Sequence, residues 1–189
     1  MTQITENDKK YLIKLARMVI QDRLGEKQPD PEPKEISPAL QEKRGCFVTL
    51  HQNNQLRGCI GTIEPIMPLI VCVKENAVLA AFQDPRFLPV SINDLAHITI
   101  EISILTQPRQ VSFQNADELV SILKPGVHGV ILSQGYMRAT FLPQVWEQLP
   151  KTEDFLAHLC LKAGMGKMCW KDPKITVEVY EVAYFSEKD

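Results

Sequence analysis

The chain has 189 residues, of which 44% are hydrophobic and 23% charged, and its formal net charge is −2. This length and apolar content are typical of a globular protein with a sizeable core, which excludes a disordered chain. The balanced charge argues against a nucleic-acid-binding protein, because such proteins usually carry a basic excess that neutralises phosphates.

The first residues, the lengths of the apolar runs and the cysteines indicate where in the cell the protein is expected. The first eight residues lack the basic and apolar regions of a secretory signal, and no run approaches the roughly 18 apolar residues of a membrane span. The sequence therefore predicts a cytoplasmic protein that does not enter a membrane. Free thiols in a reducing compartment, without a metal or cofactor site, are the expectation for five irregularly spaced cysteines, Cys46, Cys59, Cys72, Cys160 and Cys169.

The N-terminal part of the chain predicts a helix followed by a loop. Thr5 and Asp8 have the spacing of a capping box, and apolar residues then recur at helical intervals up to Leu24. Gly25 ends this pattern. Residues 28–38 contain four prolines and several charges, which indicates an extended polar loop.

Residues 46–63 predict a β-hairpin with strands at 46–50 and 56–63. Asn53 and Asn54 form its expected turn, because asparagine tolerates positive φ. A turn centred there pairs residues whose numbers sum to 107, which puts Cys59 opposite Val48 and diagonal to Cys46. Strand alternation further places Arg57, Cys59 and Gly61 on one face.

A largely apolar stretch, 69–83, predicts a buried helix that begins after Pro68 and ends at Asp84-Pro85. Glu75 and Asn76 lie on it, so at least one of these polar side chains should be hydrogen-bonded.

Further along, alternation and turn residues predict strands and helices in mixed order. They are a strand at 97–106, a helix at 116–123, a hairpin of 129–133 and 136–142, a helix at 153–163 and one long final strand at 175–185. Because several strands join as hairpins, the expected fold class is α+β, with a mostly antiparallel sheet flanked by helices. The whole chain, 1–189, is expected to be a single domain.

The most informative segment is Leu56-Arg57-Gly58-Cys59-Ile60-Gly61. Two glycines weaken a strand, so they mark a bulge or a place where another group approaches the backbone closely. A guanidinium on the same face as Cys59 would favour the nucleophilic thiolate. The alternative is that Cys59 is a small buried hydrophobe and that the glycines only shape a bulge.

This segment closely resembles the signature of the AMMECR domain family. The resemblance extends to six further motifs in the same order: Gly45-Cys46-Phe47-Val48-Thr49-Leu50, Glu75-Asn76-Ala77, Asp84-Pro85-Arg86-Phe87, Glu101-Ile102-Ser103-Ile104-Leu105, Gly126-Val127-His128-Gly129-Val130 and Thr140-Phe141-Leu142-Pro143-Gln144-Val145. The family implies an α+β fold with a larger and a smaller lobe and with the signature near the cleft between them. Prokaryotic members resemble protein A of the AmmeMemoRadiSam set, found alongside a Memo-type protein and a radical-SAM protein, and the family implies no settled activity.

Arginines near the signature are candidates for binding a substrate anion. Arg57 could hold a carboxylate or phosphate bidentately, or could pair structurally with Glu64 or Glu101. A rigid Asp84-Pro85-Arg86 turn could place Arg86 at the cleft, or Asp84 could simply satisfy loop amides.

Two more residues complete the candidate site. His128 lies between glycines and could serve as the base for Cys59, although a histidine in a turn is more often a surface or hydrogen-bonding residue. Glu101 is on the outward face of its strand, where it could be solvated or could face the second lobe.

These residues support two hypotheses about function. In the first, Cys59 attacks an unidentified small-molecule substrate, His128 moves protons, and Arg57 or Arg86 holds the substrate's anionic group, in hydrolysis or group transfer. In the second, Gly58 and Gly61 receive a ligand or partner segment without catalysis. The Memo-type and radical-SAM proteins are then the expected partners, on family association alone.

Overall fold

The predicted capping box starts the first helix in the computed structural model, which describes residues 2–26 and 36–188. The Asp8 amide donates to Thr5 Oγ1 (3.2 Å), and the Thr5 amide donates to Asp8 Oδ2 (2.9 Å). These reciprocal bonds satisfy amides that the first turn leaves without helical partners. The helix α1 (Glu6–Arg23) then buries the apolar stripe that its spacing predicts, including Leu12 and Leu15.

The chain divides into two compact units. The larger comprises Met1–Leu105 and Ala183–Asp189, and the smaller comprises Thr106–Val182. Each contains its own hydrophobic core. The prediction of a single domain with a cleft between two lobes stays a prediction.

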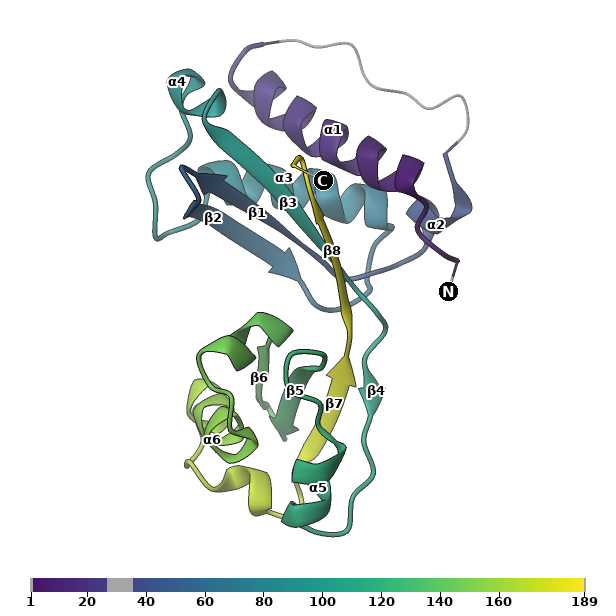
Figure 1. Cartoon of the computed structure of the whole chain (residues 1–189), viewed down its shortest axis with the longest axis vertical. Helices are drawn as coiled ribbons and strands as arrows, with labels where there is room; N and C mark the ends of the chain where they lie inside the picture. Colours follow the sequence, from purple (N-terminus) through teal and green to yellow (C-terminus); the bar gives the residue numbers. More distant parts are fainter. Residues whose placement is uncertain (1, 27–35, 189) are drawn as a thin grey trace. The chain divides into compact units, whose positions relative to one another are not determined.

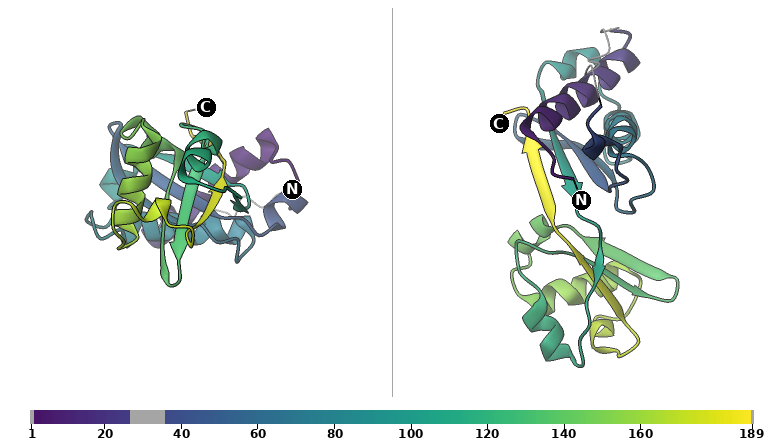
Figure 2. Two further views of the ribbon diagram at one scale, coloured as in Figure 1. Left: turned by 90° about the horizontal axis from the view of Figure 1, so that it is seen from below. Right: turned by 90° about the vertical axis from the view of Figure 1, so that its right-hand side faces the viewer.

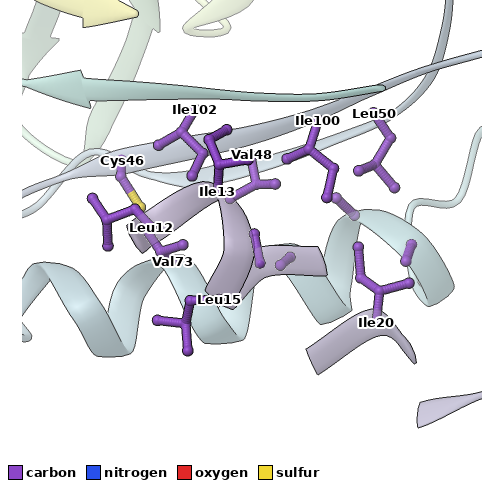
Figure 3. Packing of buried hydrophobic residues seen from close by; sticks show 14 of the residues in the cluster. Leu12, Ile13, Leu15, Ile20, Cys46, Val48, Leu50, Val73, Ile100 and Ile102 are labelled. Carbon is purple, nitrogen blue, oxygen red and sulfur yellow. The ribbon is translucent and has the colours of Figure 1, made fainter. Parts of the chain in front are cut away.

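A four-stranded sheet in the order β2-β1-β3-β8 forms the larger unit, together with helices (Figure 1). The core lies between α1, α3 and one face of this sheet, where Val48 and Ile102 are fully buried (Figure 3). The bounds are α2 (Pro38–Gln41), β1 (Cys46–Gln52), β2 (Gln55–Thr62), α3 (Leu69–Phe82), α4 (Ile92–Leu95), β3 (Ile98–Leu105) and β8 (Val182–Ser186).

The smaller unit is built on a second sheet in the order β4-β7-β5-β6. Figure 2 shows this unit from two further directions, with α5 and α6 beside its strands. The bounds are β4 (Arg109–Gln110), α5 (Ala116–Ile122), β5 (Gly129–Gln134), β6 (Met137–Phe141), α6 (Thr152–Lys162) and β7 (Thr176–Tyr180), with 3-10 helices at Pro143–Glu147 and Cys169–Lys171.

The predicted fold class, α+β with mostly antiparallel pairing, is confirmed. The pairs β1–β2, β1–β3, β4–β7, β5–β6 and β5–β7 are antiparallel. Among the described residues, no helix combines the length and apolar character needed to cross a membrane.

Three local predictions need correction. The final strand, predicted at 175–185, is two strands, because the chain leaves one sheet at Tyr180 and joins the other at Val182. Cys160 and Cys169 form a disulfide rather than remaining free thiols, since the turn after α6, at Gly164, brings the 3-10 helix that begins at Cys169 back to Cys160. In the predicted loop, 28–35 lies outside the described residues, while Pro38 begins α2 and Ser37 caps it.

Close packing of α3 on β2 explains Gly58. A Cβ added at this position would collide with the carbonyl oxygen of Ala80 in α3. Gly61 lies on the other face of β2, where an added Cβ would collide with the Phe47 ring. Both glycines therefore permit contacts inside the unit.

We expect Gly58→Ala to lower the free energy of unfolding by about 3 kcal/mol, because α3 must move away from the sheet to admit the methyl group. Urea denaturation would measure this loss. Gly166→Ala is the matched control, since nothing lies within 4 Å of a Cβ there. Equal stability of the two variants would contradict the packing explanation.

Candidate functional site

The register of the β1–β2 hairpin decides where Cys59 points. Asn53 and Asn54 form the predicted turn with φ of 53° and 63°. Next to the turn the pairs sum to 107, as in His51↔Leu56, but the next pair is Leu50↔Gly58, which leaves Arg57 as the extra residue of a β-bulge. Cys59 therefore lies opposite Thr49, and the predicted pairing with Val48 and approach to Cys46 are wrong.

The shifted register gathers several polar residues on the sheet face opposite α1 and α3. Thr49 lies between Cys59 on β2 and Glu101 on β3, so these three residues form one row across the sheet. We call this surface the Cys59 face. By strand alternation it consists of Phe47, Thr49, His51, Cys59, Gly61, Thr99, Glu101 and Ser103.

Asp84 and Arg86 cover the outer edge of β2 at Cys59. The Cys59 amide donates to Asp84 Oδ2 (2.9 Å), and Arg86 Nη2 donates to the Cys59 carbonyl oxygen (3.2 Å). Arg86 also binds Asp84 bidentately, from Nε to Oδ1 (2.9 Å) and from Nη2 to Oδ2 (2.7 Å). The two side chains thus satisfy the backbone groups that a neighbouring strand would otherwise pair.

Asp84 is buried, whereas Arg86 is about half exposed. The Asp84 side chain is only 2% exposed, and hydrogen bonds from Arg86 hold the pKa of its carboxyl well below the usual value despite that burial. The Arg86 side chain is 53% exposed, and its Nη1 takes no part in the bonds to Asp84 and Cys59. Arg86 is therefore a fixed guanidinium with one side still available to a ligand.

Cys59 is a hydrogen-bonded thiol. Thr49 Oγ1 donates to its sulfur (3.2 Å). Burial raises the pKa of the Cys59 thiol, and the carboxylates of Asp84 and Glu101 add to this increase, whereas Thr49 and Arg86 act in the opposite direction. The net effect favours the neutral thiol at pH 7 over the thiolate that a resting nucleophile requires.

Arg57 points to a different partner from those predicted. Its guanidinium Nη2 donates to the Pro89 carbonyl oxygen (3.3 Å) and lies 3.7 Å from Asp94 Oδ2. These contacts connect the bulge to the segment around α4, and the Arg57 side chain is only 15% exposed. The cation whose charge acts on Cys59 is Arg86.

His51 and Thr49 are members of the Cys59 face that the sequence interpretation missed. His51 Nε2 lies 4.0 Å from Glu101 Oε2, and about a third of each side chain is exposed. Alternation along β1 was the available signal, since 47, 49 and 51 share one face. This alternation identifies His51 and Thr49 as neighbours of Cys59 only once the β1–β2 register is known.

His128 belongs to the smaller unit and is buried there. Its Nδ1 accepts a hydrogen bond from the Lys124 amide (3.2 Å), and its carbonyl oxygen accepts one from Trp146 Nε1 (2.7 Å). Burial, followed by the charge of Arg109, lowers the pKa of the His128 imidazole. These contacts support a structural role, and the predicted Cys59–His128 pair stays a prediction.

Metal-ligating side chains do not cluster in residues 2–26 and 36–188, the part of the chain that the structure describes. No group of three or more histidine, cysteine, aspartate or glutamate residues comes together there in a way that could hold an ion.

Asp84→Asn should lower the free energy of unfolding at pH 7 by about 2 kcal/mol, because it weakens charge-assisted bonds to Cys59 and Arg86. The depressed pKa of Asp84 also fixes the pH dependence. Its stabilising effect is complete above the unfolded value of about 3.9 and is lost as pH falls through the lower folded value. Urea denaturation from neutral to acidic pH should therefore show a shrinking difference between wild type and variant. A difference independent of pH would contradict this assignment.

Comparison with known proteins identifies the family. The AMMECR1 family profile matches residues 13–185. "Protein MJ0810" of Methanocaldococcus jannaschii is 38% identical over 99% of this chain and 94% of its own, and "Protein NEQ441" of Nanoarchaeum equitans is 40% identical over 93% and 98%. The crystal structure of uncharacterized protein PH0010 from Pyrococcus horikoshii superposes with a TM-score of 0.86 at 34% identity, covering 98% of this chain and 94% of that one. The chain therefore belongs to the AMMECR1 family.

Proposed function

We propose that this protein is a substrate-handling protein that binds a small dipolar molecule on the Cys59 face. The main support for this proposal is that opposite charges flank the Cys59 thiol. Arg86 lies beyond the outer edge of β2, and Glu101 lies two strands away on β3. Adjacent strands are about 4.8 Å apart, so roughly 10 Å separates the Cys59 and Glu101 backbones. A zwitterion whose charged ends are several bonds apart, such as a short peptide or an ω-amino acid, matches this scale, whereas the two ends of an α-amino acid lie too close together.

Each end of such a ligand would meet a suitable group. Its anionic end would lie on Arg86, whose planar guanidinium suits a carboxylate. Its amino end would lie towards Glu101, with His51 beside that carboxylate. Cys59 and Thr49 would contact the middle of the ligand, Cys59 as a neutral thiol.

The raised pKa of Cys59 favours binding over catalysis by a resting thiolate. The reactions considered from the sequence, hydrolysis and group transfer by Cys59, would need a change that lowers this pKa. Association with Memo-type and radical-SAM proteins stays a prediction from family resemblance.

The thiol state can be measured by alkylating the folded protein with iodoacetamide across a range of pH. We expect Cys59 to react more slowly at pH 7 than a cysteine in a peptide, with an apparent pKa above the free value of about 8.5. Glu101→Gln should speed the reaction, because it removes a negative charge that raises the pKa. An apparent pKa below the free value would overturn the neutral-thiol assignment and restore the nucleophile hypothesis. Tandem mass spectrometry would separate Cys59 from Cys72, which share the tryptic peptide 58–74.

Ligand binding is tested by protecting Cys59 from iodoacetamide with a series of short peptides and ω-amino acids of increasing length. We expect at least one zwitterion to protect, whereas acetate and ethylamine, which carry one end each, should protect less. Arg86→Gln should abolish the protection and Arg86→Lys should retain part of it, because lysine keeps the charge. Absence of protection by every zwitterion, or equal protection of wild type and Arg86→Gln, would count against the proposal.

A further inference from the structure

Two cysteines outside the Cys59 face lie together in the core of the larger unit. Cys46 is on β1 and Cys72 is on α3, and the two residues are 0% and 1% exposed. Figure 3 shows Cys46 among the buried side chains that fill the space between the sheet and the helices. The two sulfur atoms are 3.0 Å apart.

This separation is shorter than an ordinary van der Waals contact between two sulfur atoms. A disulfide needs an S–S distance of about 2 Å, so closure requires a movement of only about 1 Å. A shared zinc ion would instead need a wider pair, because Zn–S bonds of about 2.3 Å in tetrahedral geometry hold the sulfurs about 3.8 Å apart. The distance therefore favours a bond between the sulfurs over a metal between them.

Asn76 holds the pair in place. Its side-chain amide donates to the Cys46 carbonyl oxygen (3.1 Å) and approaches the sulfur of Cys72 (3.3 Å) and that of Cys46 (3.5 Å). Asn76 is itself buried, at 2% exposure. An amide that donates towards sulfur stabilises negative charge there, which is the charge an oxidation step must pass through.

The two thiols are not equivalent. The Cys46 thiol donates to the sulfur of Cys72. This hydrogen bond lowers the pKa of Cys72, while the same bond, together with burial, raises the pKa of Cys46. Cys72 is thus the more readily ionised sulfur, and Cys46 is the partner thiol that can resolve an oxidised intermediate.

We propose that Cys46 and Cys72 form an oxidation site, a dithiol that a small hydroperoxide converts to a disulfide joining β1 to α3. In the first step the Cys72 sulfur attacks the O–O bond of the peroxide, forming a sulfenic acid and releasing water or an alcohol. In the second step the Cys46 sulfur attacks the Cys72 sulfur, and the hydroxyl group leaves with a proton as water. Overall, the two thiols lose two electrons and two protons, and hydrogen peroxide is reduced to two molecules of water.

Burial restricts the oxidant. The pair is enclosed by the core, so a large protein disulfide has no direct approach, whereas a peroxide is small enough to enter during local opening. The resulting bond would tie α3 to the strand next to β2, and α3 is the helix that packs against Gly58. Oxidation would therefore stiffen the larger unit on the side opposite the Cys59 face.

The test uses the full chain with Cys59→Ala, so that Cys46 and Cys72 are the free thiols left among the described residues. After treatment with hydrogen peroxide, we expect the loss of two hydrogen atoms and a cross-link between the tryptic peptides 45–57 and 58–74. The cross-link should raise Tm by roughly 5–10 °C, because it closes a long loop in the unfolded chain. Cys160–Cys169 is followed separately in its own peptides, 152–162 and 168–171.

Cys72→Ala in the same background is the matched control, which should give neither the cross-link nor the Tm increase. Oxidation of the pair to sulfinic acids without a cross-link, or thiols that persist at peroxide levels that oxidise exposed methionines, would overturn the proposal. A cross-link that lowers Tm would also overturn it, because the bond would then distort the fold. None of these outcomes depends on Cys59, so they leave the ligand-binding proposal to its own test.

Discussion

The extra residue at Arg57 determines which side chains of the larger unit meet. A shift of one position in an antiparallel pair exchanges the two faces of a strand. With the bulge, Gly58 turns towards α3, where only a hydrogen fits beside the Ala80 carbonyl, and Cys59 turns to the other face. Without it, Cys59 would enter the core beside Cys46 and the polar row with Thr49 and Glu101 would not form.

The edge of the sheet depends on a second constraint. A bare edge strand presents unpaired N–H and C=O groups that invite pairing with another chain. Asp84 and Arg86 bind both backbone groups of Cys59 and so occupy the edge with side chains. The same contacts fix Arg86 in space, which links the protection of the edge to the charge proposed to receive a ligand.

The cysteines of the larger unit have different environments and different chemistry. Burial, with a smaller contribution from nearby carboxylates, raises the pKa of Cys59, so this thiol suits contact and hydrogen bonding. Cys72 accepts a hydrogen bond from Cys46 and has a lowered pKa, so it suits oxidation. The residue in the recognisable signature is therefore the less ionised of the two, although the signature is what draws attention to it.

Local patterns in the sequence determined the elements whose causes lie within a few residues. The capping box at Thr5, the Asn53-Asn54 turn, the start of α3 after Pro68 and the α+β class follow from side-chain hydrogen bonds, backbone preferences and periodicity. The family signature also located the segment around Cys59. The tertiary structure alone decided the bulge at Arg57, the division of the last strand at Glu181, the Asp84–Cys59 contact and the pairing of the cysteines. Each of these depends on a partner distant in the chain, and alternation along one strand carries no information about the register or packing of its neighbours.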